Sequence, residues 1–208
     1  GRRVRLYIKG DYTKEIPFDY LELAKKMWFE NYQGESIPLS YSGFRQIRDR
    51  NDIAIHLKLD KQDYDELWLH VPIQEGIKYR FFSQIDEELN LDYEDAYVTD
   101  FRENGDCLRL ISTHLELLTL DKRAFYIMAI EIATIFNGQI SEDDKKTWIT
   151  IDEFKEKHED ILSLTFEEAN EMSLEEIQMI DAIDDPIWEE LDRKREEYIR
   201  IHGEVELD

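Results

Sequence analysis

Three things are scarce in this sequence: cysteine, positive charge and long apolar runs. The single cysteine, Cys107, cannot form a disulfide within the chain and stands in an apolar, strand-like stretch. This predicts a buried thiol in a reducing compartment, so we expect a cytoplasmic protein. Glu131 interrupts the best apolar stretch before it reaches the roughly 18 residues of a transmembrane helix, and we expect no membrane partner. The first residues enter a strand pattern directly, which is not typical of a signal peptide.

Basic residues are outnumbered throughout most of the chain. The 26 lysines and arginines stand against 49 aspartates and glutamates, which gives a net charge of −23. Residues 141–208 alone hold eight basic and twenty-four acidic residues. Such a field repels nucleic acid and favours a basic protein partner, so we expect the latter and no nucleic-acid partner. The alternative interpretation is an acidic surface that only prevents aggregation.

Local motifs for catalysis and cofactor binding are missing. The eight glycines form no phosphate-binding loop and no dinucleotide-binding pattern, and no nucleophile elbow occurs. The five histidines lack the spacing of metal ligands. We therefore predict no catalytic residue and no cofactor. An enzyme whose carboxylates converge only in the folded chain stays open as an alternative.

Hydrophobic periodicity predicts the α+β class, with an antiparallel sheet packed on helices and a helical, acidic C-terminal third. The predicted order of elements in the first 140 residues is β-α-β-β-α-β-β-α, while residues 35–52 are ambiguous between a short helix and a loop. An Asn-Gly pair predicts a hairpin between the last two of these strands. The predicted strands are residues 4–9, 53–59, 67–71, 97–101 and 108–112, and the predicted helices are residues 17–34, 79–91 and 121–136.

The helix over residues 121–136 is the predicted centre of the core. At 3.6 residues per turn, its apolar side chains are distributed nearly all the way round the helix, so we expect the helix to be covered on more than one side. For the domains, we predict an α+β domain over residues 1–162, with two small β-α-β-β units, 1–76 and 77–162, as an alternative. Residues 163–208 are predicted to form an acidic helical segment packed on that domain.

Capping patterns divide the C-terminal third into helices. Thr165 with Glu168, and Ser173 with Glu176, each place a hydroxyl three residues before a glutamate, which is the capping-box pattern of a helix start. Pro186 is placed at the first position of another helix. Acidic residues in first helical turns are favoured by the helix dipole, so these starts explain many of the C-terminal charges.

The acidic loop after the central helix resembles a calcium-binding loop in outline. If Glu153 were the bidentate twelfth ligand, Lys146 would fall on a ligand position and Thr147 on the turn that requires glycine. We therefore predict no metal site. The preferred interpretation is a short strand over residues 147–151, with Thr150 or Asp152 capping the next helix.

One run sets tyrosines among carboxylates and is the candidate partner-binding surface. Tyrosine anchors surrounded by acidic side chains suit the capture of a basic protein. A loop in which the tyrosines are incidental is the alternative interpretation. The candidate partner-binding residues are Asp92, Tyr93, Glu94, Asp95 and Tyr97.

From Ile132 to Phe154, an apolar helix ends in glycine, passes through an acidic turn and reaches a Trp-containing strand before a Glu-Phe helix start. This pattern resembles small acidic bacterial α+β proteins, many of them uncharacterised and some of them immunity proteins paired with secreted toxins. The resemblance concerns packing and carries no binding residue across. It implies a toxin-neutralising role.

Together, these observations predict a non-enzymatic, acidic interaction protein that sequesters a basic protein partner, in the manner of an immunity protein. The first alternative is an enzyme with a carboxylate-lined pocket that no sequence motif reveals. The second is a structural or regulatory module, including a homodimer formed through the C-terminal helix.

Overall fold

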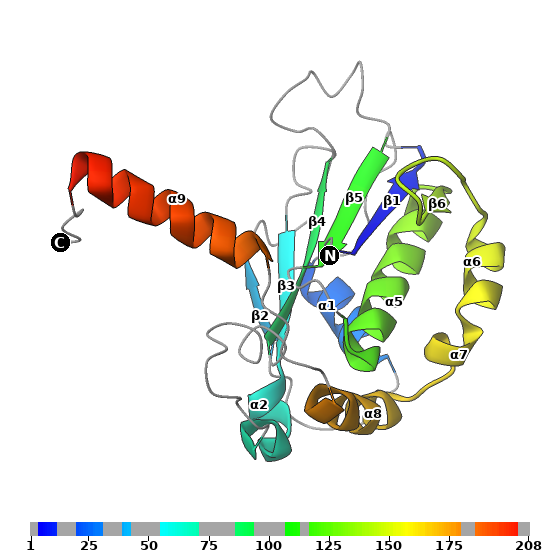
Figure 1. The fold of residues 1–208 in the computed structure, drawn as a ribbon. Coiled ribbons are helices and arrows are strands. Elements are labelled where there is room, and N and C mark those ends of the chain that lie inside the picture. Colours follow the sequence, from blue (N-terminus) through cyan, green and yellow to red (C-terminus); the bar gives the residue numbers. More distant parts are fainter. Residues whose placement is uncertain are drawn as a thin grey trace.

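The computed structural model describes residues 4–11, 20–30, 39–42, 55–70, 86–93, 107–112, 117–179 and 186–203 (Figure 1). The strands are β1 (Arg5–Lys9), β2 (Leu39–Ser42), β3 (Ile55–Asp60), β4 (Asp86–Tyr93), β5 (Cys107–Ser112) and β6 (Gln139–Ser141). The helices are α1 (Tyr20–Phe29), α2 (Lys61–Tyr64), the 3-10 helix η2 (Glu66–His70), α5 (Thr119–Ile135), α6 (Ile151–Lys157), α7 (Glu159–Leu162), α8 (Phe166–Met179) and α9 (Pro186–His202).

The six described strands form one antiparallel sheet in the order β2-β3-β4-β5-β1-β6. In β1, β3 and β5, alternation places buried leucine and isoleucine side chains on one face, and the register brings such side chains together across strands. Leu57 lies opposite Leu89, and Ile8 lies opposite both Leu108 and Ile140. The strand nearest the start of the chain therefore sits between β5 and β6 and joins both halves of the sequence in one sheet.

Helices α1 and α5 lie against this apolar face, and α6 and α7 lie outside α5 (Figure 1). Helix α8 crosses the N-terminal end of α5. Twelve residues of α5 are buried because the sheet, α1 and the outer helices contact it from different sides. This confirms the prediction that the helix is covered on more than one side. Each fully buried Leu, Ile or Phe contributes about 1.5–3 kcal/mol to this packing.

The fold is therefore of the predicted α+β class, with an antiparallel sheet and a helical C-terminal third. Strands β1, β3 and β5 and helices α1 and α5 agree with the predicted elements. Helix α9 projects away from the sheet and the other helices (Figure 1). It ends at Gly203, whose φ of +79° and N–H bond to the Ile199 carbonyl form a left-handed cap.

The strand predicted over residues 67–71 is wrong, because Glu66–His70 form η2. Leu67, an apolar position of the predicted strand, is 57% exposed, whereas the next residue, Trp68, is fully buried, which is the reverse of the predicted pattern. The Asp65 carboxylate accepts a bond from the Leu67 N–H at 2.9 Å, which starts the turn. Local side-chain bonding therefore replaces strand pairing here.

The helix predicted over residues 79–91 is also wrong in its described part, where Asp86–Tyr93 form β4. This strand pairs with β3 on one side and β5 on the other, so its backbone groups are satisfied by pairing. Residues 79–85 lie outside the described residues, as do the strand predicted at 97–101 and the Asn-Gly hairpin. The ambiguous stretch 35–52 contributes β2.

The turn from α5 into β6 requires close approach between two backbones. Asn137 adopts a φ of +51°, and the Gly138 N–H bonds the Ala133 carbonyl at 2.8 Å to close the helix. A Cβ atom on Gly138 would collide with the carbonyl oxygen of Lys9. The strand predicted over residues 147–151 is reduced to one bridge, in which Ile149 pairs with Ile140.

Candidate functional site

The predicted partner-binding run is only partly within the described residues. Asp92 and Tyr93 are the last two residues of β4. Glu94, Asp95 and Tyr97 lie outside the described residues. This surface therefore stays a prediction, and the described candidate sites are on the helical side of the molecule.

A buried ion pair joins the start of α2 to the start of α5. The Lys61 Nζ lies 2.8 Å from the Asp121 Oδ1, and both side chains are 0% exposed. Burial raises the pKa of the Asp121 carboxyl, and the charge of Lys61 opposes this rise. The lysine Nζ also lies 5.6 Å from the centre of the Trp68 ring, within cation–π range. No solvent or substrate reaches this pair, so its role is to hold the fold.

Helix α8 supplies the cap that α5 lacks. Leu118 is the N-cap residue of α5 and forms no side-chain cap bond. Instead, the Leu120 N–H donates to the Ser173 Oγ at 2.8 Å, and the Thr119 N–H donates to the Glu176 Oε1 at 3.0 Å. The second predicted helix start is therefore wrong: both capping side chains belong to the middle of α8 and serve another helix. The α5 dipole also favours a carboxylate at this position.

The first capping box is present at the start of α8. The Glu168 N–H donates to the Thr165 Oγ1 at 3.1 Å, and the Thr165 N–H donates to the Glu168 Oε1 at 3.1 Å. The predicted cap of α6 is resolved in favour of Thr150, which forms the same reciprocal pair with Glu153. Both helices therefore begin at the capping boxes of their own sequences.

Further buried polar contacts fix α8 and its approach. The Trp68 Nε1–H donates to the Asn170 Oδ1 at 2.9 Å, and the Asn170 Nδ2–H donates to an Asp65 carboxylate oxygen at 3.0 Å. The fully buried Arg123 donates to the carbonyls of Leu164 and Trp28. These bonds, with the cap of α5, make α8 a preorganised surface.

The acidic loop is ordered by its own side chains. The Asp143 Oδ1 accepts bonds from the Thr147 N–H at 2.8 Å and the Ser141 hydroxyl at 2.9 Å. The bonds from Thr147 in particular lower the pKa of the Asp143 carboxyl. Among the described residues, no group of three or more His, Cys, Asp or Glu side chains could hold a metal ion.

A lysine and a histidine contact Glu142 of the same loop, and a tyrosine stacks on the histidine. Its carboxylate lies 2.7 Å from both the Lys157 Nζ and the His158 Nε2. The imidazole stacks on Tyr126 with ring centres 4.0 Å apart. Burial, followed by the charges of Glu142 and Asp160, raises the pKa of Tyr126 to about 12, so its phenol is protonated at neutral pH. The cluster therefore ties the loop to α6 and provides no activated hydroxyl.

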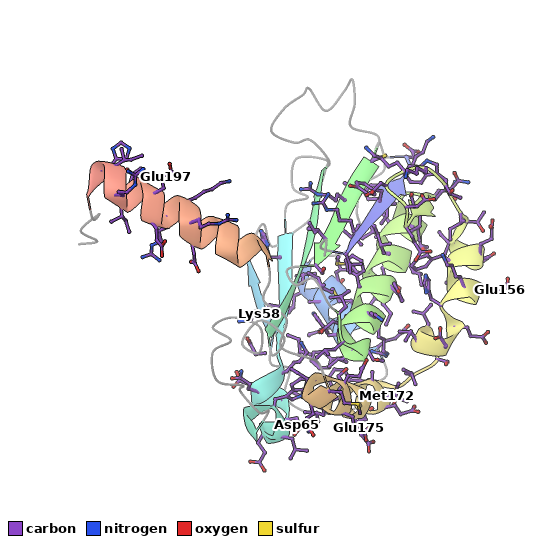
Figure 2. All side chains as sticks on the ribbon, viewed as in Figure 1. Lys58, Asp65, Glu156, Met172, Glu175 and Glu197 are labelled. Carbon is purple, nitrogen blue, oxygen red and sulfur yellow. The ribbon has the colours of Figure 1, made fainter. Side chains whose placement is uncertain are left out.

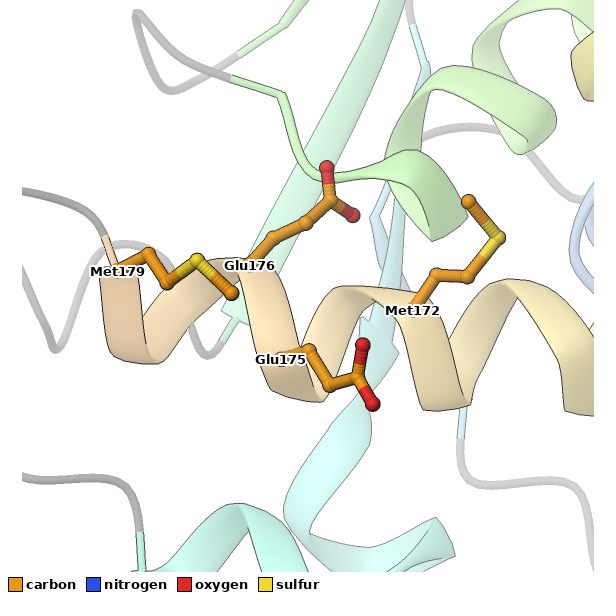
Figure 3. Close-up of a pocket in the computed structure, with 4 residues that line it drawn as sticks. All are labelled: Met172, Glu175, Glu176 and Met179. Atoms are coloured by element: carbon orange, nitrogen blue, oxygen red, sulfur yellow. The ribbon is translucent and has the colours of Figure 1, made fainter.

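A groove of about 360 Å³ lies along α8, lined by Met172, Glu175, Glu176 and Met179 (Figure 3). The methionines are two turns apart on one side of the helix, and they are 42% and 76% exposed. The two carboxylates point in different directions, and that of Glu176 is directed toward the start of α5 (Figure 3). They do not converge on one point in the groove, as a pair for acid–base catalysis would.

Helices α6, α7 and α8 are rich in carboxylates. Residues 151–179 contain ten acidic and two basic residues, and α8 itself has no lysine or arginine. Nine of the ten acidic side chains are exposed. Figure 2 shows Glu156 on α6 and Glu175 on α8 pointing outward. We call residues 151–179 the acidic layer.

Sequence reasoning missed the groove and the buried ion pair. Met172 and Met179 are seven residues apart in a glutamate-rich helix, and this spacing would have indicated an apolar strip on an acidic face. Nothing in the sequence pairs Lys61 with Asp121, because they meet only after the chain has folded. Lys61 lies in a polar stretch and Asp121 begins the predicted helix 121–136, and both positions predict exposure to solvent.

None of the described helices is both long and apolar enough to span a bilayer. No protein-family model, curated protein or solved structure matches this chain.

Proposed function

We propose that this chain is a non-enzymatic interaction protein that captures a basic protein, most concretely as the cytoplasmic neutraliser of a toxin enzyme. The observation that carries the proposal is the acidic layer. It contains ten carboxylates and two basic side chains, so its net charge is strongly negative and attracts an external cation. A basic protein is the partner that such a surface attracts most strongly.

The attachment of the acidic layer also supports binding. Side chains that must hold a partner bind more tightly when they are fixed beforehand, because less entropy is lost on association. Helix α8 is fixed by the Trp68–Asn170 bond and by the cap that Ser173 and Glu176 give to α5. Its exposed glutamates are thus presented from a rigid support.

The toxin-neutralising part of the proposal rests on the resemblance of residues 132–154 to immunity-type proteins. It is tested by co-expression of the chain with the protein encoded by the neighbouring gene, because an immunity protein is normally encoded beside its toxin. We expect the neighbouring product to arrest growth alone and to be harmless with this chain. A neighbouring product that is harmless alone, or one that arrests growth in both cases, would count against the toxin-neutralising role.

A matched pair of variants tests whether the acidic layer does the binding. One variant replaces Glu167, Glu171 and Glu175 by glutamine, and the control replaces Asp192 by asparagine and Glu196 and Glu197 of α9 by glutamine. Both change the net charge equally, and all six side chains are exposed. We expect the first to slow association with the partner by about tenfold and the control to change it much less. Equal effects would mean that only net charge matters.

A further inference from the structure

We infer that the groove between Met172 and Met179 binds the apolar face of a basic, amphipathic helix of the partner. This inference rests on the proposed function and names the surface and the recognised chemistry. The two methionines are exposed although they belong to a helix whose opposite side is fully buried at Phe166, Ala169 and Ile177. Exposed apolar side chains that form a hollow are typical of binding surfaces.

The spacing of the methionines fits a helix. They are seven residues apart, so they are separated by roughly 10 Å along α8. A helix that lies along the groove presents apolar side chains at positions i, i+3 or i+4, and i+7 over the same distance. Methionine is unbranched and adaptable, which suits contact with side chains of different shapes.

Charge complementarity selects a basic helix. The methionines are flanked on α8 by Glu168, Glu171 and Glu175, which are exposed, and α8 has no cation of its own to neutralise them. An acidic or neutral helix would bury the apolar strip but would leave these carboxylates repelled or unpaired. A basic amphipathic helix would place its apolar face on the methionines and its lysines and arginines beside these carboxylates.

The test uses synthetic peptides because it then does not depend on the natural partner. One peptide is a lysine–leucine helix with its leucines on one face, and the other has the same composition in an order that forms no apolar face. Binding is measured by calorimetry to the full chain, to the double variant Met172→Gln, Met179→Gln, and to Leu67→Gln. Leu67 is 57% exposed on η2 and serves as the matched control for removing an exposed apolar side chain.

We expect the full chain to bind the amphipathic peptide at least about tenfold more tightly than the peptide without an apolar face, since the apolar contacts add to the charge attraction. The methionine double variant should lose this preference, and Leu67→Gln should keep it. Unfolding midpoints of all three proteins are measured alongside. If a variant is destabilised, the NMR signals of the isotope-labelled methyl groups of Met172 and Met179 in the unsubstituted chain report on the groove instead. Peptide-induced shifts confined to other methionines would overturn the inference.

The outcomes separate this inference from the proposed function. If both peptides bind and the methionine variant behaves as the full chain does, the groove is not the site although capture of basic chains stands. If neither peptide binds at low ionic strength, both proposals fail. If light scattering shows that the chain alone forms a dimer that the methionine variant loses, the occupant is a second copy and the inference is overturned.

Discussion

At the scale of single residues, the buried Lys61–Asp121 pair makes the clearest prediction. Replacing Lys61 by methionine leaves a carboxylate buried without its counter-charge, which should cost about 3–5 kcal/mol of unfolding free energy. The double variant Lys61→Met, Asp121→Leu should recover most of this loss, because an apolar pair of similar volume avoids the desolvation of charges. Denaturant unfolding midpoints measure both effects.

The control for this experiment is an ion pair near the surface. The Lys58 Nζ lies 3.3 Å from the Asp60 Oδ1, with side chains 31% and 22% exposed. Lys58→Met should cost about 0–1 kcal/mol, because solvent screens the pair. Equal losses for Lys58→Met and Lys61→Met would contradict the importance of burial at the second site.

Asp143 predicts a pH dependence of stability. Its pKa is lowered from the usual 3.8 by bonds from Thr147 and Ser141, so the ionised carboxylate stabilises the folded loop. This contribution is present above the ordinary carboxyl pKa and is lost as the pH falls through the lower, folded value. Asp143→Asn should therefore be less stable than the natural chain at neutral pH, and the difference should disappear in acid. A difference that stays constant across this pH range would contradict the prediction.

At the scale of elements, the cap that α8 gives to α5 is testable. Ser173→Ala removes the acceptor of the Leu120 N–H, and a lost helix cap costs about 1 kcal/mol. Hydrogen exchange at Leu120 should become faster. Glu176→Ala should do the same at Thr119, whereas Glu175→Ala should leave both amides unchanged. Unaltered exchange at these amides in the first two variants would mean that α5 does not depend on this cap.

Elements with one unambiguous periodicity were predictable from the sequence. The alternation in β1 and β5 and the nearly continuous apolar surface of α5 each allow one interpretation. Strand β4 was missed because Leu89 belongs both to a helical spacing with Phe81, Phe82 and Ile85 and to an alternation with Leu91. Pairing with β3 and β5 decides between these patterns, and such long-range pairing is not contained in the local sequence.

The candidate site was less predictable than the fold. Charge indicated that the C-terminal third carries the acidic surface, but the pattern of Ser173 and Glu176 was interpreted as a local helix start. The same residue types bind any exposed helix N–H groups, whether in their own helix or in a neighbouring one. Only the packing of α8 against α5 shows which helix they serve.

At the scale of the whole molecule, the net charge of −23 predicts an effect of salt on stability. Like charges repel one another in the compact state, and mobile ions screen this repulsion over about 8 Å at physiological ionic strength. The melting temperature should therefore rise when sodium chloride is added at low ionic strength. The glutamine variant at Glu167, Glu171 and Glu175 should show a smaller rise. A melting temperature that falls with salt would indicate that attractive ion pairs dominate the surface.

The most direct test of the central claim is isolation of the chain with its bound partner from its own cells at low ionic strength. We expect one protein in stoichiometric amount, with an isoelectric point above about 9, that is released as the salt concentration is raised. An acidic partner, or a partner that stays bound regardless of salt, would contradict the claim that the acidic layer captures basic proteins. Isolation of the chain without any protein partner under these conditions would contradict it equally.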